Sequence, residues 1–371
     1  MKFIRRLKDN ATLKALGPGL ITGAADDDPS GIATYSQAGA QFGFNTLWTL
    51  VLTYPFMVGI QLVSARIGRV TGRGLAANIR RAYSPWLLYA IVILLLVANV
   101  INIAADIAAM GEAAHLVTGT GSAHLYSLGF GVLCLSLQVF LPYAAYVRYL
   151  KWLTMGLLAY VATVFAVKLD WLEVLQRTVW PHFSFTRESV ALIVAIFGTT
   201  ISPYLFFWQA SQEVEEIRAG GARSLRKRPM DATIQLGRIK TDTFIGMGFS
   251  NLVAYFIILT TAVTLGAHGI TTIQTSAQAA EALRPVAGEF AFLLFALGIV
   301  GTGLLAVPVL AGSAAYAVTE SFKWKNGLDL KAIEAQEFYG IIALATIGGM
   351  LLNFAPIDPI KALVLSAQIN G

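Results

Sequence analysis

The most constraining feature of this sequence is a run of three aspartates inside an apolar stretch. Residues 17–43, GPGLITGAADDDPSGIATYSQAGAQFG, are apolar enough to enter a membrane, yet Asp26, Asp27 and Asp28 lie in the middle. A carboxylate near the bilayer centre costs about 2.5 to 3.5 kcal/mol on insertion scales, so it requires a partner. Pro29 follows at once and a glycine stands two residues later, which predicts an interrupted helix. Carbonyl groups freed at such a break, beside a carboxylate, predict a cation site.

Composition places the whole chain in a membrane. Of 371 residues, 56% are hydrophobic and 13% charged, and the mean hydropathy is +0.65. These values lie outside the range of soluble globular proteins and are typical of polytopic helical membrane proteins. The single cysteine, Cys134, excludes an internal disulfide. We expect one transmembrane domain over residues 1–371, with a first repeat over about 12–168 and a second over about 188–371 whose tenth helix is incomplete.

Apolar runs near the length of a bilayer crossing recur along the chain. They predict spans at 17–43, 45–65, 86–110, 124–142, 150–167, 190–211, 242–266, 288–318, 337–354 and 359–371. Most of the 27 Lys and Arg residues fall in the N-terminal segment and the even-numbered connections. The positive-inside rule then predicts a cytoplasmic N-terminus in a prokaryotic plasma (inner) membrane. The expected surroundings are a lipid bilayer; we expect no nucleic-acid partner, and the oligomeric state stays open.

A second interruption repeats the pattern of the first. Gly198, Thr199, Ser202 and Pro203 break the otherwise apolar sixth span halfway along its length. Breaks in the first and sixth spans are what two inverted repeats of five helices predict. We therefore expect an all-α polytopic membrane protein of leucine-transporter-like fold, with broken helices 1 and 6 and a cation site between them.

The third span carries a polar stripe. Asn99, Asn102 and Asp106 are spaced i, i+3 and i+7, so they share one helix face. Polar groups in lipid should face the bundle interior. Asp106 and Asn102 either line the path of the permeating ion or form polar contacts that hold neighbouring helices together.

Residues 28–43, DPSGIATYSQAGAQFG, carry a resemblance to a known family. They resemble the DPGN motif and the following AGAQFG of the natural resistance-associated macrophage protein (Nramp) family of divalent-metal transporters. The likeness extends from residue 17 to about 367. In that family the motif's Asp and Asn, a preceding backbone carbonyl, and a Met and a carbonyl on the sixth helix hold the metal. The resemblance therefore implies a metal site at these positions, namely Asp28, Ala25, Gly31, Thr199 and Ser202.

Two of the family's ligands are replaced here. Its Asn falls on Gly31 and its Met on Ser202. Methionine sulfur favours transition metals, whereas carboxylate, hydroxyl, carbonyl and water suit hard ions. The loss of the Asn side chain predicts a wider site, which fits Mg²⁺ because that ion keeps several waters. We expect import of Mg²⁺, with Mn²⁺ also accepted, as in the Nramp-related magnesium transporters. The alternative is a proton-coupled Mn²⁺/Fe²⁺ symporter of the ordinary type.

The groups implied for proton coupling are largely missing. Asp106 matches an Asp of the family's third helix, but Ala109 stands where a Glu is expected. Tyr204 replaces the sixth-helix His and does not titrate near neutral pH. Residues 337–355 contain no Arg, Lys or His. We therefore expect uncoupled transport, which a negative interior favours by about 4.6 kcal/mol per 100 mV for a divalent ion.

Several polar residues keep a structural alternative. Asp28 could cap the following helix, since Asp is a good N-cap. Asp26 and Asp27 could line the aqueous approach or pair with the backbone or another side chain. Ser202 could bond back to its own helix. The glutamates near the end of the sixth span are expected to be a solvated helix end; they are Glu213, Glu215 and Glu216.

An intramembrane enzyme is the rival from another class. It would need a catalytic pair on neighbouring helices, and Asp28 with Asp106 is the pair that the sequence offers. We find no nucleophile elbow, phosphate loop or HExxH motif. A sodium-coupled amino-acid carrier is disfavoured because the three aspartates would repel a substrate carboxylate, and a channel stays conceivable. We expect a transporter that is not an enzyme and needs no cofactor besides the transported ion.

Overall fold

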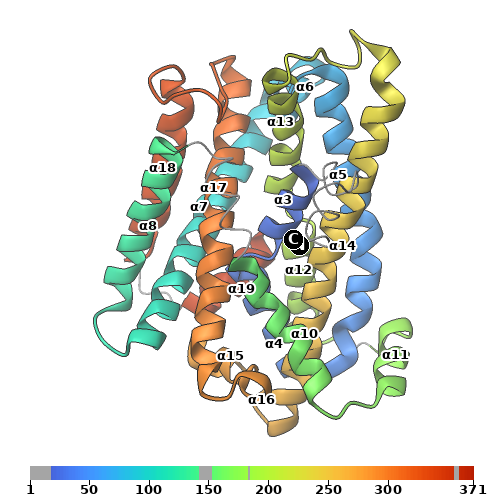
Figure 1. Ribbon diagram of the computed structural model, residues 1–371, viewed down its shortest axis with the longest axis vertical. Coiled ribbons are helices and arrows are strands. Elements are labelled where there is room, and N and C mark those ends of the chain that lie inside the picture. The colour runs from blue at the N-terminus through green and yellow to red at the C-terminus, as the bar shows by residue number, and fades with distance from the viewer. Residues whose placement is uncertain (1–17, 142–152, 183, 355–358) are drawn as a thin grey trace, which may run out of the picture.

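The computed structural model describes residues 18–141, 153–182, 184–354 and 359–371 (Figure 1). These residues form helices and no β-strand. The α-helices are α3 Pro18–Asp26, α4 Pro29–Phe42, α5 Leu47–Thr71, α6 Leu75–Ala82, α7 Pro85–Thr118, α8 Ala123–Phe140, α10 Leu158–Ala166, α11 Trp171–Val179, α12 Arg187–Thr200, α13 Pro203–Ala219, α14 Ala232–Thr264, α15 Ser276–Glu281, α16 Arg284–Ala287, α17 Ala291–Phe322, α18 Gln336–Leu352 and α19 Pro359–Asn370. Short 3-10 turns are η1 Gly43–Thr46, η2 Leu153–Leu157, η3 Pro229–Asp231, η4 Gly266–His268 and η5 Gly288–Phe290.

The predicted spans coincide with helices over their described parts. Six helical stretches in the described residues are long and apolar enough to cross a membrane. Several helices run past the predicted ends: α7 continues to Thr118, and α14 begins at Ala232. Hydropathy marks only the part of a helix that lies in hydrocarbon, so helices that extend into the polar interface exceed it. The prediction of an all-α integral membrane protein is confirmed.

Both predicted breaks are present. The first span consists of α3, which ends at Asp26, and α4, which begins at Pro29. The sixth consists of α12 and α13, and Ser202 lies extended between them, directly before Pro203. A proline pushes the preceding residue out of the helical region and is well suited to the first helical position, so each Pro both ends one helix and starts the next.

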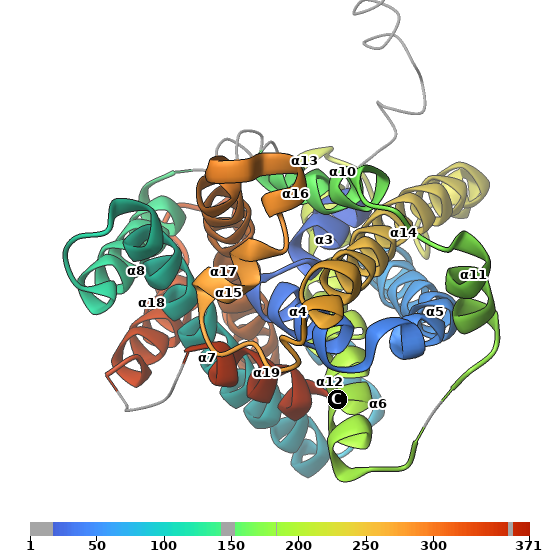
Figure 2. The ribbon, with the colours of Figure 1, turned by 90° about the horizontal axis from the view of Figure 1, so that it is seen from below.

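The broken helices lie at the centre of the bundle. Helices α3 and α4 both pack along α14, and α12 packs against α4 and α19 (Figures 1 and 2). Helices α8 and α18 lie together at one edge (Figure 1). The close approach of α3 to α14 depends on two glycines, because a Cβ added at Gly23 would run into the backbone of Gly246. Small residues permit such close contacts between helices in membranes.

An ion-pair network ties three helices at the end of the bundle that carries α6, at the top of Figure 1. Arg238 on α14 contacts Oε2 of Glu213 on α13 at 2.6 Å, and Arg69 on α5 contacts the same oxygen at 3.8 Å. Glu216 joins both arginines, at 2.9 and 3.7 Å. The Glu213 side chain is fully buried, so the expectation that it belongs to a solvated helix end is wrong. It is covered because α5 and α14 flank this part of α13.

The glycine contact gives a testable prediction for stability. We expect Gly23→Ala to lower the free energy of unfolding by about 1 to 3 kcal/mol, the usual cost of overpacking. Gly59 on α5 is the matched control, because a Cβ there would meet nothing within 4 Å. Gly59→Ala should be neutral or stabilising by about 0.5 to 1 kcal/mol. Thermal unfolding of the purified variants measures both, and equal unfolding temperatures would contradict the account.

Candidate functional site

Asp28 caps the helix that follows the first break. Its backbone is extended, and Oδ1 accepts hydrogen bonds from the Gly31 amide and the Ser30 hydroxyl, each at 2.7 Å. The side chain is buried, with the residue 2% exposed. Both hydrogen bonds fall on one carboxylate oxygen. The capping role is therefore present, and it engages one side of the carboxylate.

A carbonyl at the end of α3 is bridged to the second broken helix. The Tyr204 hydroxyl on α13 donates to the Ala25 carbonyl at 3.1 Å. Both residues are buried. A carbonyl oxygen has two lone pairs, so this bond leaves one for another partner. The contact joins the two interruptions directly, from α13 to the last turn of α3.

At the second break, the Ser202 hydroxyl forms hydrogen bonds with backbone carbonyls of the preceding helix. Ser202 Oγ lies 2.9 Å from the Gly198 carbonyl and 3.0 Å from the Thr199 carbonyl, so the hydroxyl bonds back onto α12. The Thr199 hydroxyl faces the first break instead. A Cβ at Gly31 would lie 3.0 Å from Thr199 Oγ1 and 3.3 Å from a ring carbon of Tyr35. The space beside Gly31 is thus filled by neighbours, and the expected widening does not occur there.

Asp26 and Asp27 turn toward α14. The Ser250 hydroxyl lies 2.5 Å from Asp26 Oδ2 and 3.1 Å from Asp27 Oδ1. Both aspartates are 1% exposed. Asp26 Oδ1 and Asp27 Oδ2 have no hydrogen-bond partner among the described residues. Of the two roles expected for this pair, the structure shows the side-chain contact.

The polar stripe of the third span faces the interior, as predicted. Asn99 donates to the Leu310 carbonyl and to Ser313 Oγ, at 2.9 and 2.8 Å, and so joins α7 to α17. Asn102 and Asp106 are fully buried, and their side-chain polar atoms have no partner within the described chain. Within the stripe, Asn99 therefore holds α7 to α17. The side-chain polar atoms of Asn102 and Asp106 form no hydrogen bond with the described residues.

Sequence reasoning missed two residues of this region, Ser250 and Tyr35. A signal existed for the first: Asp242, Gly246 and Ser250 recur every fourth residue and mark one face of α14 with small or polar side chains. No three His, Cys, Asp or Glu residues of the described chain are placed to hold a metal together. An ion bound here would therefore combine one or two carboxylates with carbonyl and hydroxyl oxygens.

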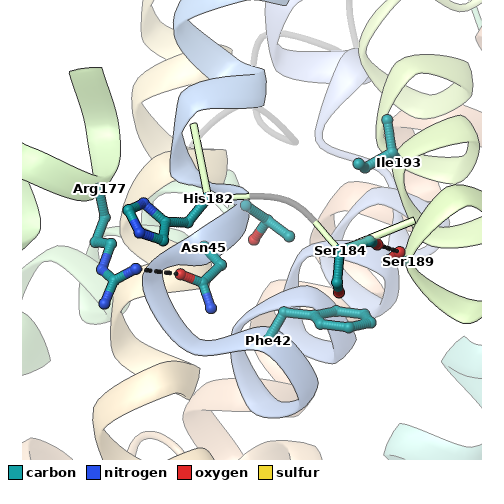
Figure 3. A pocket seen from close by; sticks show the side chains of 8 residues that line it. Phe42, Asn45, Arg177, His182, Ser184, Ser189 and Ile193 are labelled. Carbon is teal, nitrogen blue, oxygen red and sulfur yellow. Dashed lines mark hydrogen bonds between the residues drawn. The ribbon is translucent and has the colours of Figure 1, made fainter. Parts of the chain in front are cut away.

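A cavity of about 270 Å³ lies away from the break, at the end of α4 (Figure 3). Asn45, Arg177 and His182 border it, and Arg177 Nη1 donates to Asn45 Oδ1 at 3.1 Å. Its lining includes no Asp or Glu. A basic side chain without a carboxylate repels a metal cation, so this cavity is not the predicted site.

Comparison with known proteins places the sequence in a family. The family model described as natural resistance-associated macrophage protein-like matches residues 19–371. A relative from Erwinia tasmaniensis, named divalent metal cation transporter MntH, is 27% identical over 337 residues, covering 86% of this chain and 75% of the relative. A protein of the same name from Acidiphilium cryptum is 27% identical over 370 residues, covering 95% of this chain and 78% of the relative.

Solved structures show the same fold. The Eremococcus coleocola manganese transporter superposes with a TM-score of 0.72 at 16% identity, over 96% of this chain and 75% of that one. Mhp1, a nucleobase-cation-symport-1 family transporter, gives a TM-score of 0.62 at 14% identity, over 95% of this chain and 75% of that one. These likenesses confirm the leucine-transporter-like fold. The chain therefore belongs to the natural resistance-associated macrophage protein family, and it is a membrane transporter rather than an enzyme.

Proposed function

We propose that this protein carries a divalent metal cation across the membrane and binds it beside Asp28. The observation that supports this most is a buried carboxylate at the junction of α3 and α4 that forms no ion pair with any described Lys, Arg or His. Relatives named as divalent metal cation transporters favour the same class of substrate. The proposed ligands are the Asp28 carboxylate, the Ala25 carbonyl and groups at Thr199. The ion is the substrate, and no cofactor takes part.

The donor atoms favour a hard ion. Around the break, the polar atoms in contact with Asp28, Ala25 and Gly31 are oxygens and backbone amides. Oxygen ligands suit Mg²⁺ and Mn²⁺, and a site without sulfur loses the preference for softer transition metals. We propose Mg²⁺ as the favoured substrate, with Mn²⁺ also accepted. Ser202 stands where the family has Met, and it supplies no sulfur; its hydroxyl donates to carbonyls of its own helix.

Transport without proton coupling follows from the same residues. Tyr204, which replaces the family's His, has its hydroxyl engaged with a backbone carbonyl. Ala109 on α7 and the apolar α18 supply none of the remaining titratable groups that the resemblance implies. A proton-coupled Mn²⁺ symporter is the competing function, and its proton would need Asp106 as carrier.

Charge distribution supports an orientation. Basic residues gather at the α6 end; examples are Arg66, Arg73, Arg81, Arg226 and Arg228. The positive-inside rule then directs this end toward the cytoplasm of a prokaryotic cell, across its plasma (inner) membrane. A negative interior drives a divalent cation inward, toward that end.

Metal uptake into proteoliposomes tests the function. We expect saturable Mg²⁺ and Mn²⁺ entry, without internal acidification, that increases when an inside-negative potential is imposed. Asp28→Ala should lower the rate at least about tenfold, equivalent to about 1.4 kcal/mol of lost binding. Asp231→Ala is the control, since this half-exposed aspartate lies outside the break and forms an ion pair with Arg228 at 3.0 Å. Ion-specific dyes and a pH dye report the fluxes.

Each contrary result identifies a different error. Mn²⁺ entry with acidification and without Mg²⁺ entry would establish the proton-coupled symporter. Undiminished flux in Asp28→Ala would remove the carboxylate from the site. Flux that never saturates with metal concentration would indicate a channel.

The packing at Gly31 gives a second prediction. Restoring the family's residue with Gly31→Asn should destabilise the protein by about 1 to 3 kcal/mol, because its Cβ would press on Thr199 and Tyr35. Thr199→Ala removes the nearest atom, so the double variant should recover part of that loss. Thermal unfolding in detergent measures both changes. A wild-type unfolding temperature for Gly31→Asn would contradict the prediction, because it would mean that Thr199 and Tyr35 move aside at no cost in stability.

A further inference from the structure

The carboxylates of Asp26 and Asp27 share a single hydrogen-bond donor. Ser250 Oγ lies within 3.1 Å of an oxygen of each, but one hydroxyl carries one hydrogen. The other oxygen of each carboxylate has no partner among the described residues. Two adjacent carboxylates in an apolar bundle therefore lack most of the compensation that buried charge requires.

Among the described residues, no basic side chain supplies that compensation. None of the ion pairs in the described chain includes Asp26 or Asp27, and both residues are 1% exposed. Water from outside the bundle therefore does not reach them. When both are ionised, two carboxylates that are buried side by side match the charge of one divalent cation.

Tyr35 supplies an independent observation. Its side chain is fully buried, and its hydroxyl has no hydrogen-bond partner in the described chain. Side chains on a helix point toward the N-terminus, so Tyr35 extends from α4 back toward the break. A ring carbon of Tyr35 lies 3.3 Å from where a Cβ on Gly31 would stand, so the ring lies at the first turn after the break. A phenol oxygen can bind a hard cation or one of its waters.

The contacts of Asp26 and Asp27 with Ser250 are distinct from the hydrogen bonds by which Asp28 caps α4. Asp28 directs Oδ1 to the first turn of its own helix, whereas Asp26 and Asp27 reach across to α14 through Ser250. We propose that Asp26, Asp27, Ser250 and Tyr35 form a second binding site for a hard divalent cation. The proposal rests on the proposed function, since it assigns to this site the same class of ion as the substrate.

A cation at this second site would connect two helices. Asp26 is the last residue of α3 and Asp27 follows it directly, whereas Ser250 belongs to α14. An ion held between them stabilises the arrangement in which α3 packs on α14, because binding to one conformation favours that conformation. Occupancy of the second site therefore controls how readily α3 leaves α14.

Binding stoichiometry of Mn²⁺ tests the second site. In detergent, the free-ion electron paramagnetic resonance signal of Mn²⁺ counts bound ions, and competition with Mg²⁺ identifies hard sites. We expect two ions per wild-type chain, one in Asp28→Ala, and one in the double variant Asp26→Asn/Asp27→Asn. Tyr35→Phe should weaken the second site about tenfold, the lower range for losing a supporting group around a metal.

Tyr160→Phe is the matched control. Tyr160 on α10 is also buried, and its hydroxyl likewise has no partner in the described residues. This variant should bind two ions as the wild type does. If Tyr35 serves only to fill space, Tyr35→Phe should leave the number and the affinity of the bound ions unchanged.

The outcomes separate this proposal from the function on which it rests. One ion per wild-type chain, lost in Asp28→Ala, would overturn the second site and retain the transport site. Two ions in the double Asn variant would place the second ion elsewhere and overturn the proposal. Two ions in Asp28→Ala, with one lost in the double Asn variant, would retain the second site and overturn the assignment of Asp28.

Discussion

Burial of three consecutive carboxylates is the constraint on which this structure depends. Charge in an apolar bundle requires hydrogen bonds or counter-charge, and an unbroken helix offers neither to its own side chains. The break at Pro29 frees the Gly31 amide, which donates a hydrogen bond to Asp28, and the close contact with α14 brings Ser250 to Asp26 and Asp27. The need to compensate these buried carboxylates therefore accounts both for the interruption of the helix and for the central position of the interrupted helix.

The two broken helices depend on each other. Tyr204 of α13 bonds to the last turn of α3, and Thr199 of α12 packs on Gly31 of α4. A larger residue at position 31 or the loss of the tyrosine hydroxyl would therefore affect both helices at once. Gly31 leaves room for the Thr199 and Tyr35 side chains that lie beside it.

Much of the fold could be predicted from the sequence, and part of the site could not. Hydropathy located the spans, and Pro29 and Pro203 located the breaks, because proline acts through local sterics. The burial of Asn102 and Asp106 followed from helical spacing. Ser250 and Tyr35 were missed because their roles depend on the rotation of α14 and α4 about their axes, which is set by long-range packing.

The helices at the α6 end are held by contacts of very different strength. Glu213 shares one buried oxygen between Arg69 and Arg238, so pulling α13 away from α5 or α14 would strand charges without solvent. Toward the same end, α3 is attached by single hydrogen bonds, from Thr22 to Gln209 at 2.5 Å and from Gly19 to Asp242 at 2.7 Å. The arginine–glutamate contacts therefore join α5, α13 and α14 into one wall, and a force that separates any two of these helices must leave a buried charge without its counter-ion.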